Sequence, residues 1–277
     1  MTVLVSDIMA AIDEFAPIDL AEEWDNVGLL VGRPGMTVSS VMIGLDPTAE
    51  LFAEARRCGS NMIITHHPLI FHPLVSVITD QPDGALLEKA IVDQVAVVGC
   101  HTNLDKAIDG VSVALARELG LVALKPLLPS SDPSYPGTGL GSVGKYERSM
   151  SSSRFVKRLL EVLNLSAVQV AGVLPERVRK VALCGGSGSE FAQAAYECGA
   201  DLYLSAEIKH STGRWAEGCG FCVVDGTHYG TEQPMVARLA ERLRLYGESK
   251  GWSLVVRVSK TQRSPFQLVS REGVNGT

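Results

Sequence analysis

Short apolar runs alternate with longer amphipathic stretches along most of this sequence. Apolar runs of this length predict buried β-strands, and the amphipathic stretches predict helices that cover the resulting sheets. The predicted strands are residues 41–45, 62–64, 95–98, 168–171, 181–183, 202–204, 222–224 and 254–258. The predicted helices are residues 48–57, 85–93, 111–119, 154–163, 190–197 and 232–246. This alternation predicts an α/β fold whose sheets are flanked by helices.

The two halves of the sequence resemble each other. Residues 41–59 align without a gap on residues 181–199, and both segments read as strand, polar turn, helix and Cys-Gly, followed by a second strand. We interpret this match as an internal duplication, although short α/β units also resemble each other by chance. Between the halves, residues 126–144 are dense in Pro, Ser and Gly, which predicts a linker.

Composition narrows the class of protein. The 277 residues carry a formal net charge of -6 and contain no basic block, which disfavours a nucleic-acid partner. We expect neither a signal peptide nor a membrane span, because the first residues lack a basic region and no run of about 18 apolar residues exists. These features predict a cytoplasmic protein with reduced cysteines. The Cys219-Gly-Phe-Cys222 motif is predicted to pack in the fold, since no second pair with zinc-ribbon spacing accompanies it.

Five of the six histidines lie just past predicted strands, where α/β sheets place their ligands. Two of them lead an H-x-x-x-carboxylate pattern. The resulting set of candidate metal ligands is His66, His67, His101, Asp105, His228 and Glu232. One tetrahedral ion would use three or four of these groups, whereas two ions about 3.5–4 Å apart would use all six. The set therefore predicts two divalent cations, with Zn, Fe, Mn and Co all suited to mixed imidazole and carboxylate ligands.

Each residue also has a simpler interpretation when it is taken alone. A histidine in a turn is often a structural hydrogen-bonding group, and we assign His72 to that class. Asp46, which precedes a proline, is most simply a turn residue or a helix cap. The glycine-rich turn at residues 185–189 could hold a phosphate on its amides, but it lacks the full spacing of a phosphate loop, so a tight turn is the favoured interpretation.

Several motifs together resemble the Nif-three-like family (NGG-one-interacting factor three), many of whose members are named type 2 homologues of GTP cyclohydrolase 1. The matching segments are EEWDNVGLLVG at residues 22–32, ITHHPLIF at 64–71, GCHTNLD at 99–105, LCGGSGSEF at 183–191 and GTHYGTE at 226–232. The resemblance implies that the six candidate residues bind two metal ions. It also implies two interlocked α/β domains and a ring-shaped homohexamer. The corresponding division is residues 1–125 plus 226–277 for the first domain and residues 126–225 for the second.

The resemblance adds one candidate outside the six ligands. The segment Ala206-Glu207-Ile208-Lys209-His210 is similar to a family segment that lies near the metals. His210 is therefore a candidate catalytic residue for proton transfer, with a structural histidine as the alternative. Trp24-Asp25-Asn26 belongs to a motif that looks structural; Asp25 or Asn26 could orient a ligand, and the sequence does not say whether either does.

Two functions remain open at this point. The first is a metal-dependent hydrolase that attacks a nucleotide or another phosphate-containing small molecule with a metal-bridging hydroxide; GTP enters only through the resemblance. The second is a hexameric protein that binds or delivers metals, or regulates partners, without catalysis. The six ligands are compatible with both functions, so the sequence does not establish an enzyme.

Overall fold

The first of two β-sheets brings together strands from both ends of the chain, in a computed structural model that describes residues 2–268. Its strands, in spatial order, are β15 (Val255–Val258), β4 (Ser40–Gly44), β5 (Met62–Thr65), β6 (Ala96–Gly99) and β2 (Gly28–Val31). The first four strands run parallel, and β2 pairs antiparallel with β6. Their carboxyl ends therefore meet at one edge of the sheet, beside the start of β2.

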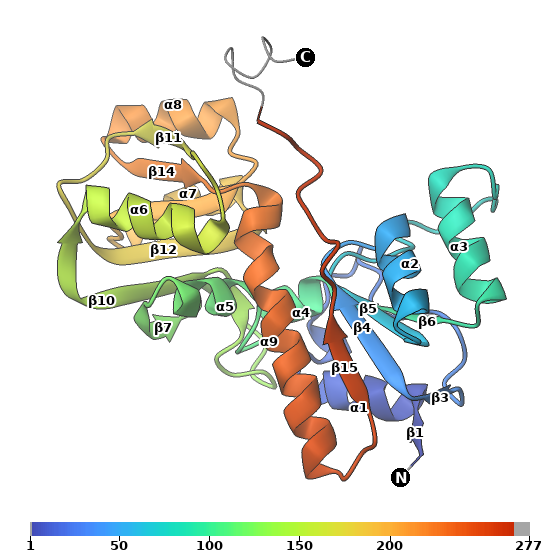
Figure 1. The fold of residues 1–277 in the computed structure, drawn as a ribbon. Helices are drawn as coiled ribbons and strands as arrows, with labels where there is room; N and C mark the ends of the chain where they lie inside the picture. The colour runs from blue at the N-terminus through green and yellow to red at the C-terminus, as the bar shows by residue number, and fades with distance from the viewer. Residues whose placement is uncertain (1, 269–277) are drawn as a thin grey trace.

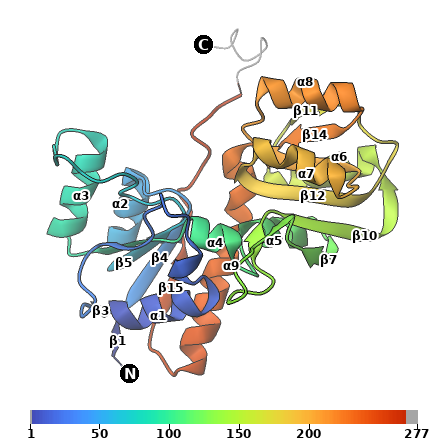
Figure 2. The same cartoon turned by 180° about the vertical axis from the view of Figure 1, so that it is seen from behind.

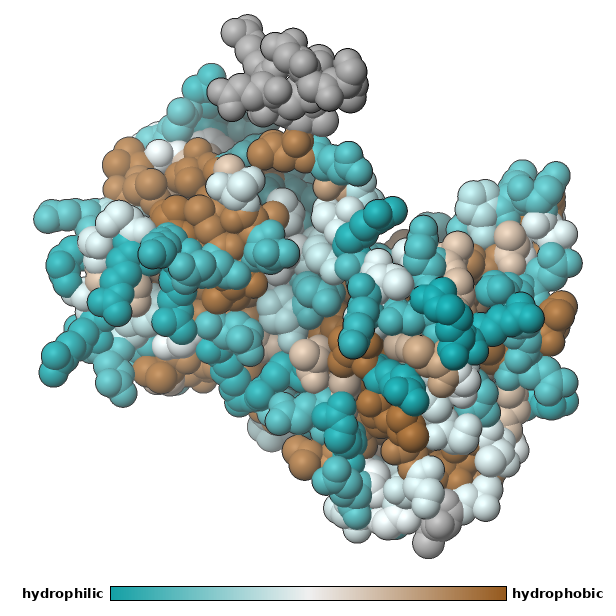
Figure 3. Space-filling view, viewed as in Figure 1, coloured by the Kyte–Doolittle hydropathy of each residue, from teal (hydrophilic) through white to brown (hydrophobic). Residues whose placement is uncertain are grey.

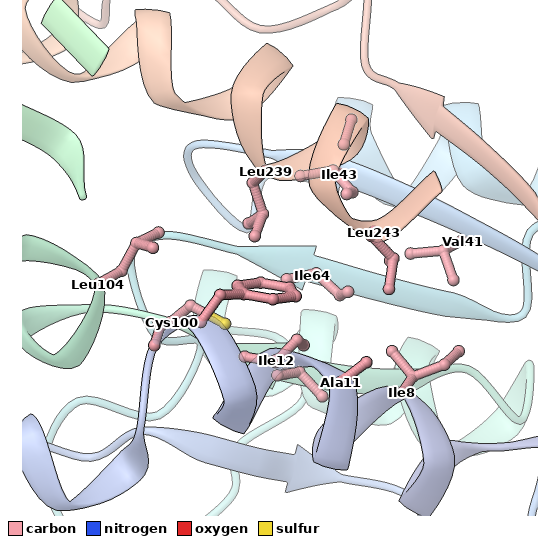
Figure 4. Close-up of a cluster of buried hydrophobic side chains, with 14 of the residues drawn as sticks. Ile8, Ala11, Ile12, Val41, Ile43, Ile64, Cys100, Leu104, Leu239 and Leu243 are labelled. Carbon is pink, nitrogen blue, oxygen red and sulfur yellow. The ribbon is translucent and has the colours of Figure 1, made fainter. Parts of the chain in front are cut away.

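Helices cover both faces of this sheet. α1 (Val5–Phe15) and α9 (His228–Ser249) pack on one face, where Ile43 and Ile64 meet Ile12 and Leu239 (Figure 4). α2 (Ala49–Arg57) and α3 (Pro82–Val92) pack on the other face. Because successive residues of a strand point to opposite faces, a sheet covered on both sides needs uninterrupted apolar strands. This requirement explains why the central strands of the sheet read as continuous apolar runs.

The second sheet has six strands. Their spatial order is β11 (Gln169–Gly172), β14 (Cys222–Asp225), β13 (Leu202–Ala206), β12 (Arg177–Ser187), β10 (Ser142–Ser151) and β7 (Val122–Lys125). The central three strands β12, β13 and β14 run parallel, and the outer strands pair antiparallel. α5 (Val111–Glu118) and α6 (Ser152–Leu163) cover one face, while α7 (Ala192–Glu197) and α8 (His210–Cys219) cover the other.

The long helix α9 links the two sheets. It follows β14 of the second sheet and leads to β15 of the first, so it runs between the two halves of the molecule (Figures 1 and 2). Its first turn is fixed by Thr227, whose side-chain oxygen accepts a hydrogen bond from the amide of Gly230. Such a cap satisfies an amide that the helix itself leaves free. The start of α9 is thereby held where the two sheets approach each other.

The predicted α/β fold with helix-flanked sheets is confirmed, and each predicted strand overlaps an observed one. Both halves contain a parallel strand pair joined by a helix, β4-α2-β5 and β12-α7-β13, as the proposed duplication requires. The predicted linker is not wholly irregular, because β8 (Leu128–Pro129) pairs with β9 (Gly139–Leu140) within it and β10 begins at Ser142. The strand β7 also joins the second sheet, although it precedes residue 126.

The remaining regular elements are short. They are β1 (Val3–Leu4), paired with β3 (Thr37–Val38), and α4 (Thr102–Lys106), together with the 3₁₀ turns η1 (Ile18–Leu20) and η2 (Ser189–Phe191). Polar side chains cover much of the surface, while apolar ones gather over the part of the second sheet that carries α6 (Figure 3). Among residues 2–268, none of the helices combines the length and the apolar character needed to cross a lipid bilayer.

Candidate metal centre

Four of the six candidate ligands follow strands of the first sheet. His66 and His67 come directly after β5, and His101 lies two residues beyond the end of β6. Asp105 lies on the short helix α4, which begins just after His101. Because β5 and β6 are parallel neighbours, their carboxyl ends bring these side chains to the same edge of the sheet.

The other two ligands come from the first turns of α9. The sequence placed the start of this helix at residue 232, but the helix begins at His228, which makes His228 and Glu232 neighbours on one helical face. His228 Nε2 lies 3.0 Å from Glu232 Oε1. Since β14 directly precedes α9, the second sheet positions these two ligands beside the three histidines of the first.

Glu232 lies at the centre of the assembled cluster. Its carboxylate is buried, with Oε2 3.1 Å from His67 Nε2 and Oε1 3.6 Å from His66 Nε2. His66 Nε2 is also 3.8 Å from Asp105 Oδ1, and the His101 ring centroid lies 5.3 Å from that of His66. The structure therefore brings all six sequence-predicted residues into one cluster.

Every histidine of the cluster is held in the same way. The Nδ1 atom of each ring lies within hydrogen-bonding distance of an oxygen that can only accept, so each Nδ1 donates. The four pairs are His66 with the Cys100 carbonyl (2.8 Å), His67 with Asp46 (2.7 Å), His101 with Asp25 (2.9 Å) and His228 with Glu207 (2.8 Å). This arrangement makes Nε2 the nitrogen of each ring that faces the cluster, where it carries a proton or binds a cation.

The cluster stabilises the ionised carboxylate at its centre. Burial opposes ionisation of Glu232, but the charge on His66 and the close approach of the surrounding imidazoles hold its pKa well below the usual range. Burial alone would lower the pKa of His67, yet the nearby carboxylates of Asp46 and Glu232 raise it to about 10. The hydrogen bond to Glu232 likewise raises the pKa of His228 to about 9, against the effect of burial. Positive charge is therefore favoured at this place, whether protons or metal ions carry it.

Two buried atoms of the cluster fit a metal better than a proton network. His66 Nε2 and Glu232 Oε2 are buried, and within residues 2–268 neither has a well-aligned hydrogen-bond partner. Buried polar atoms without a partner are rare and costly. Two atoms that bind a common ion at about 2.1 Å lie roughly 3–4 Å apart, which is the spacing observed around Glu232. Two groups could each hold an ion, His66-His67-His101 and His67-His228-Glu232.

The structure corrects one assignment and resolves another. Asp46, interpreted as a turn residue or cap, instead accepts the hydrogen bond from His67, and its own amide donates to Gln262 Oε1 at 2.8 Å. Within the Trp24-Asp25-Asn26 motif, Asp25 accepts the hydrogen bond from the candidate ligand His101. Burial raises the pKa of Asp25, but hydrogen bonds from His101 and Thr102 outweigh this effect and keep it well below the usual range.

The glycine-rich turn after the first part of β12 shapes the cluster sterically. Its first two amides are already engaged, because the N–H of Gly185 donates to Ser112 Oγ and that of Gly186 donates to Thr231 Oγ1. Gly186 has a φ of +68°, and an added Cβ there would lie 2.2 Å from Glu232 Oε1. Residues 185–187 belong to β12, where its register against β13 shifts, so the segment is an irregular strand end rather than the tight turn that the sequence favoured.

Other sequence candidates lie apart from the cluster. Among the described residues, His210 forms no hydrogen bond or ion pair with the six; it is exposed at the start of α8 and lines a cavity of about 470 Å³ with Lys209 and Asp225. His72 is exposed and packs against Phe71. All six cysteines are free thiols in the part of the chain that the structure describes.

The fold and the cluster define a class: α/β proteins with a histidine and carboxylate site that could hold metal ions at their strand ends. The family model for Duf34/NIF3 (NGG1p interacting factor 3) matches residues 3–265. The chain therefore belongs to this family, and the resemblance found in the sequence motifs is confirmed.

Relatives and solved structures agree with this assignment over almost the whole chain. A Streptomyces coelicolor protein named "GTP cyclohydrolase 1 type 2 homolog" is 34% identical and covers 95% of this chain and 93% of its own length. A hypothetical protein from Staphylococcus aureus has a similar structure, with a TM-score of 0.90, 28% identity and coverage of 96% of this chain and 99% of its own. A Bacillus cereus protein described as related to NIF3 has a TM-score of 0.90 and 25% identity, with the same coverage of 96% and 99%.

Proposed function

We propose that the cluster binds two divalent cations and that the protein is a metal-dependent hydrolase acting on a nucleotide or another phosphate-containing substrate. The observation that carries this proposal is the convergence of three imidazoles on Glu232, with the fourth, His101, beside His66 and His67. The Nδ1 atom of each of the four rings is engaged elsewhere. The name of the Streptomyces coelicolor relative supports GTP as one substrate to test.

The donor set supports two ions more than one. The two groups that could hold an ion share His67, and Asp105 lies beside the first of them, 3.8 Å from His66. A single ion would leave several of these groups without a partner. Nitrogen and carboxylate ligands suit Zn, Fe, Mn or Co, so we propose one of these metals.

The exposure of the ligands supports catalysis over simple storage. His66 and Glu232 are buried, whereas the side chains of His67 and His228 are 23% and 32% exposed. A substrate can therefore approach one side of the cluster while the other side is closed by protein. Fully enclosed ligands would instead support the alternative, a metal-binding, metal-delivery or regulatory protein without catalysis.

The residues of the chain then have separate roles. When bound, two cations supply Lewis-acid activation of water and of a substrate oxygen. His66, His67, His101 and His228 present Nε2 atoms in orientations fixed by their Nδ1 partners. Glu232 contributes negative charge between them. Proton transfer by His210 would require a substrate that reaches from the cluster to α8, because no contact joins His210 to the cluster within residues 2–268.

A turnover assay tests the hydrolase. Metal-loaded protein is incubated with GTP and with a panel of phosphate esters, and wild type is compared with Asp105→Ala and Glu232→Ala. We expect both variants to lose most activity, because each removes a charged ligand. Elemental analysis counts the ions per subunit, and sedimentation checks that the variants still assemble. Activity that is unchanged in both variants would refute the hydrolase, and bound ions without any turnover would favour the non-catalytic alternative.

Three broader predictions belong to the same proposal. We propose the domain division 1–125 plus 226–277 and 126–225, which the two sheets support except that β7 and α5, both before residue 126, pack with the second sheet. We also propose a homohexamer, with which membership of the family is compatible. Sedimentation equilibrium of the purified protein tests the oligomer. The cytoplasmic location stays a prediction from the sequence.

A further inference from the structure

Two large aromatic side chains lie exposed beside the candidate metal ligands. Trp24 is 60% exposed and Phe71 is 39% exposed. Their rings meet edge to face with centroids 5.9 Å apart, and each also contacts the His101 ring, at 6.2 and 5.9 Å. The His101 ring lies 5.7 Å from that of His67. The aromatic pair is therefore continuous with the imidazoles of the cluster.

The backbone around Trp24 is firmly held although its side chain is exposed. The amide of Glu22 donates to Thr102 Oγ1 at 2.9 Å, which joins this loop to the start of α4. The side-chain amide of Asn26 donates to the carbonyl of Ile70 at 2.6 Å, which joins it to the loop that carries Phe71. The exposure of the indole is thus a property of a fixed loop conformation.

Such a surface is suited to one kind of ligand. Rigid aromatic side chains offer a large contact area at a small entropic cost, and a surface that is already ordered binds more tightly than one that must be ordered first. Planar heteroaromatic rings stack on Trp and Phe with little dependence on which ring is offered. We propose that Trp24 and Phe71 bind the planar heteroaromatic ring of a substrate, such as a nucleobase, beside the metal cluster.

This assignment rests on the proposed function, because the ring is useful there only if the cluster binds metals. A ring held beside His101 would place its substituents next to the candidate ligand atoms. The competing occupant is a second copy of the chain. The nearby loop exposes Leu74 (49%) and Val75 (102%), so an interface between copies could also cover the aromatic pair. The experiment is designed to separate these two occupants.

Calorimetric titration of metal-loaded protein with guanosine and with ribose 5-phosphate tests the ring site without requiring turnover. Guanosine carries the ring without a phosphate, and ribose 5-phosphate carries a phosphate without the ring. In Trp24→Ala we expect guanosine affinity to fall roughly tenfold to a hundredfold, while ribose 5-phosphate affinity stays unchanged. Trp24→Phe keeps an aromatic face and should stay within about threefold of wild type. Quenching of tryptophan fluorescence by guanosine should weaken in both variants.

Two controls accompany these variants. Leu245→Ala removes an apolar side chain that is 58% exposed on α9, far along the helix from His228, and should leave both affinities unchanged. Elemental analysis should give the wild-type metal content in every variant, because the change at Trp24 leaves Asp25 and His101 in place.

Several results would overturn the proposal. One is guanosine affinity in Trp24→Ala equal to that of wild type, and another is no guanosine binding by wild type. A change in the sedimentation of Trp24→Ala with unchanged guanosine affinity would assign the aromatic pair to an interface between copies. The hydrolase fails separately. If guanosine binding depends on Trp24 but no substrate is hydrolysed, the ring site stands and the hydrolase is rejected. If a substrate is hydrolysed but guanosine binding does not depend on Trp24, the hydrolase stands and the ring site is rejected.

Discussion

Replacement of Gly186 by alanine tests whether the glycine-rich turn shapes the metal cluster. The new Cβ would lie 2.2 Å from Glu232 Oε1 and 3.4 Å from His228 Nε2. The turn cannot easily withdraw, because the amide of Gly186 donates to Thr231 Oγ1 and its carbonyl accepts from Ser205 Oγ. Ordinary contacts of a Cβ begin near 3.4 Å, so the carboxylate would have to retreat by about 1 Å.

The magnitude has two parts, and a second glycine separates them. Alanine in the left-handed region costs about 1–2 kcal/mol wherever it is placed. Gly199 has a φ of +72° with no atom within 4 Å of an added Cβ, so Gly199→Ala carries that cost alone. Gly186→Ala also pushes Glu232 away from His67 and His228, which adds about 1.5–3 kcal/mol for a charged hydrogen bond.

The effect on metal binding should be larger than the effect on folding. Metal–ligand distances tolerate deviations of about 0.2 Å, so a carboxylate displaced by about 1 Å no longer coordinates. We expect Gly186→Ala to lose at least one of the two proposed ions, and Gly199→Ala to keep both. Urea unfolding with and without a chelator measures the stability, and elemental analysis measures the metal content. Wild-type metal content in Gly186→Ala, or equal destabilisation of the two variants, would refute this reasoning.

Four further predictions concern the support of the cluster, the stability of the fold and the occupancy of the metal sites. Asp46→Ala releases the His67 ring and should weaken metal affinity about 10- to 100-fold in chelator competition; unchanged affinity would contradict the role of Asp46. Gln262→Ala removes the acceptor of the Asp46 amide and should weaken metal affinity in the same assay by a smaller factor than Asp46→Ala. A loss of affinity equal to or larger than that of Asp46→Ala would contradict the indirect role of Gln262. Burial opposes ionisation of Glu54, but hydrogen bonds, led by that from Ser259, hold its pKa below the usual value. The ionised Glu54 therefore contributes stability above its unfolded pKa, and this stability is lost as the pH falls through the lower pKa of the folded state. In urea unfolding, Glu54→Gln should lose less stability on acidification than wild type. Equal losses in the two proteins would contradict this prediction. Removing the metals should cost about 2.7 kcal/mol of unfolding free energy if the free metal was a hundred times its Kd, and identical unfolding curves would exclude tight binding to the native state.

Sequence patterning identified the fold because the buried strands are local features. Residues 62–64, for example, form an uninterrupted apolar run, since both faces of β5 are covered by helices. The strand β10 and the helix α8 were not predicted, because their sequences lack a clear local pattern. β10 contains no apolar run, because polar residues such as Lys145 and Glu147 interrupt it, and α8 contains Gly213 and Gly218, which weaken its helical pattern.

The six-residue cluster was predictable because its members follow the ends of neighbouring strands. The residues that orient them were harder to assign, since their partners are distant in sequence. Asp46 precedes a proline and reads locally as a turn, while its partner His67 is 21 residues away, just after the next strand, β5. Gln262 accepts a hydrogen bond from the amide of Asp46, which lies 216 residues away in the sequence, and no local pattern marks that contact.

The position of the cluster explains why both halves of the chain are needed to build it. Three histidines come from the strand ends of the first sheet, whereas the second sheet supplies the start of α9, the carboxylate of Glu207 after β13 and the turn at Gly186 in β12. Neither sheet alone holds a complete set of ligands. Cations bound among these groups would therefore join the two sheets, and any shift of one sheet against the other would change the spacing around Glu232. Metal binding and the relative placement of the two halves are, on this geometry, a single coupled equilibrium.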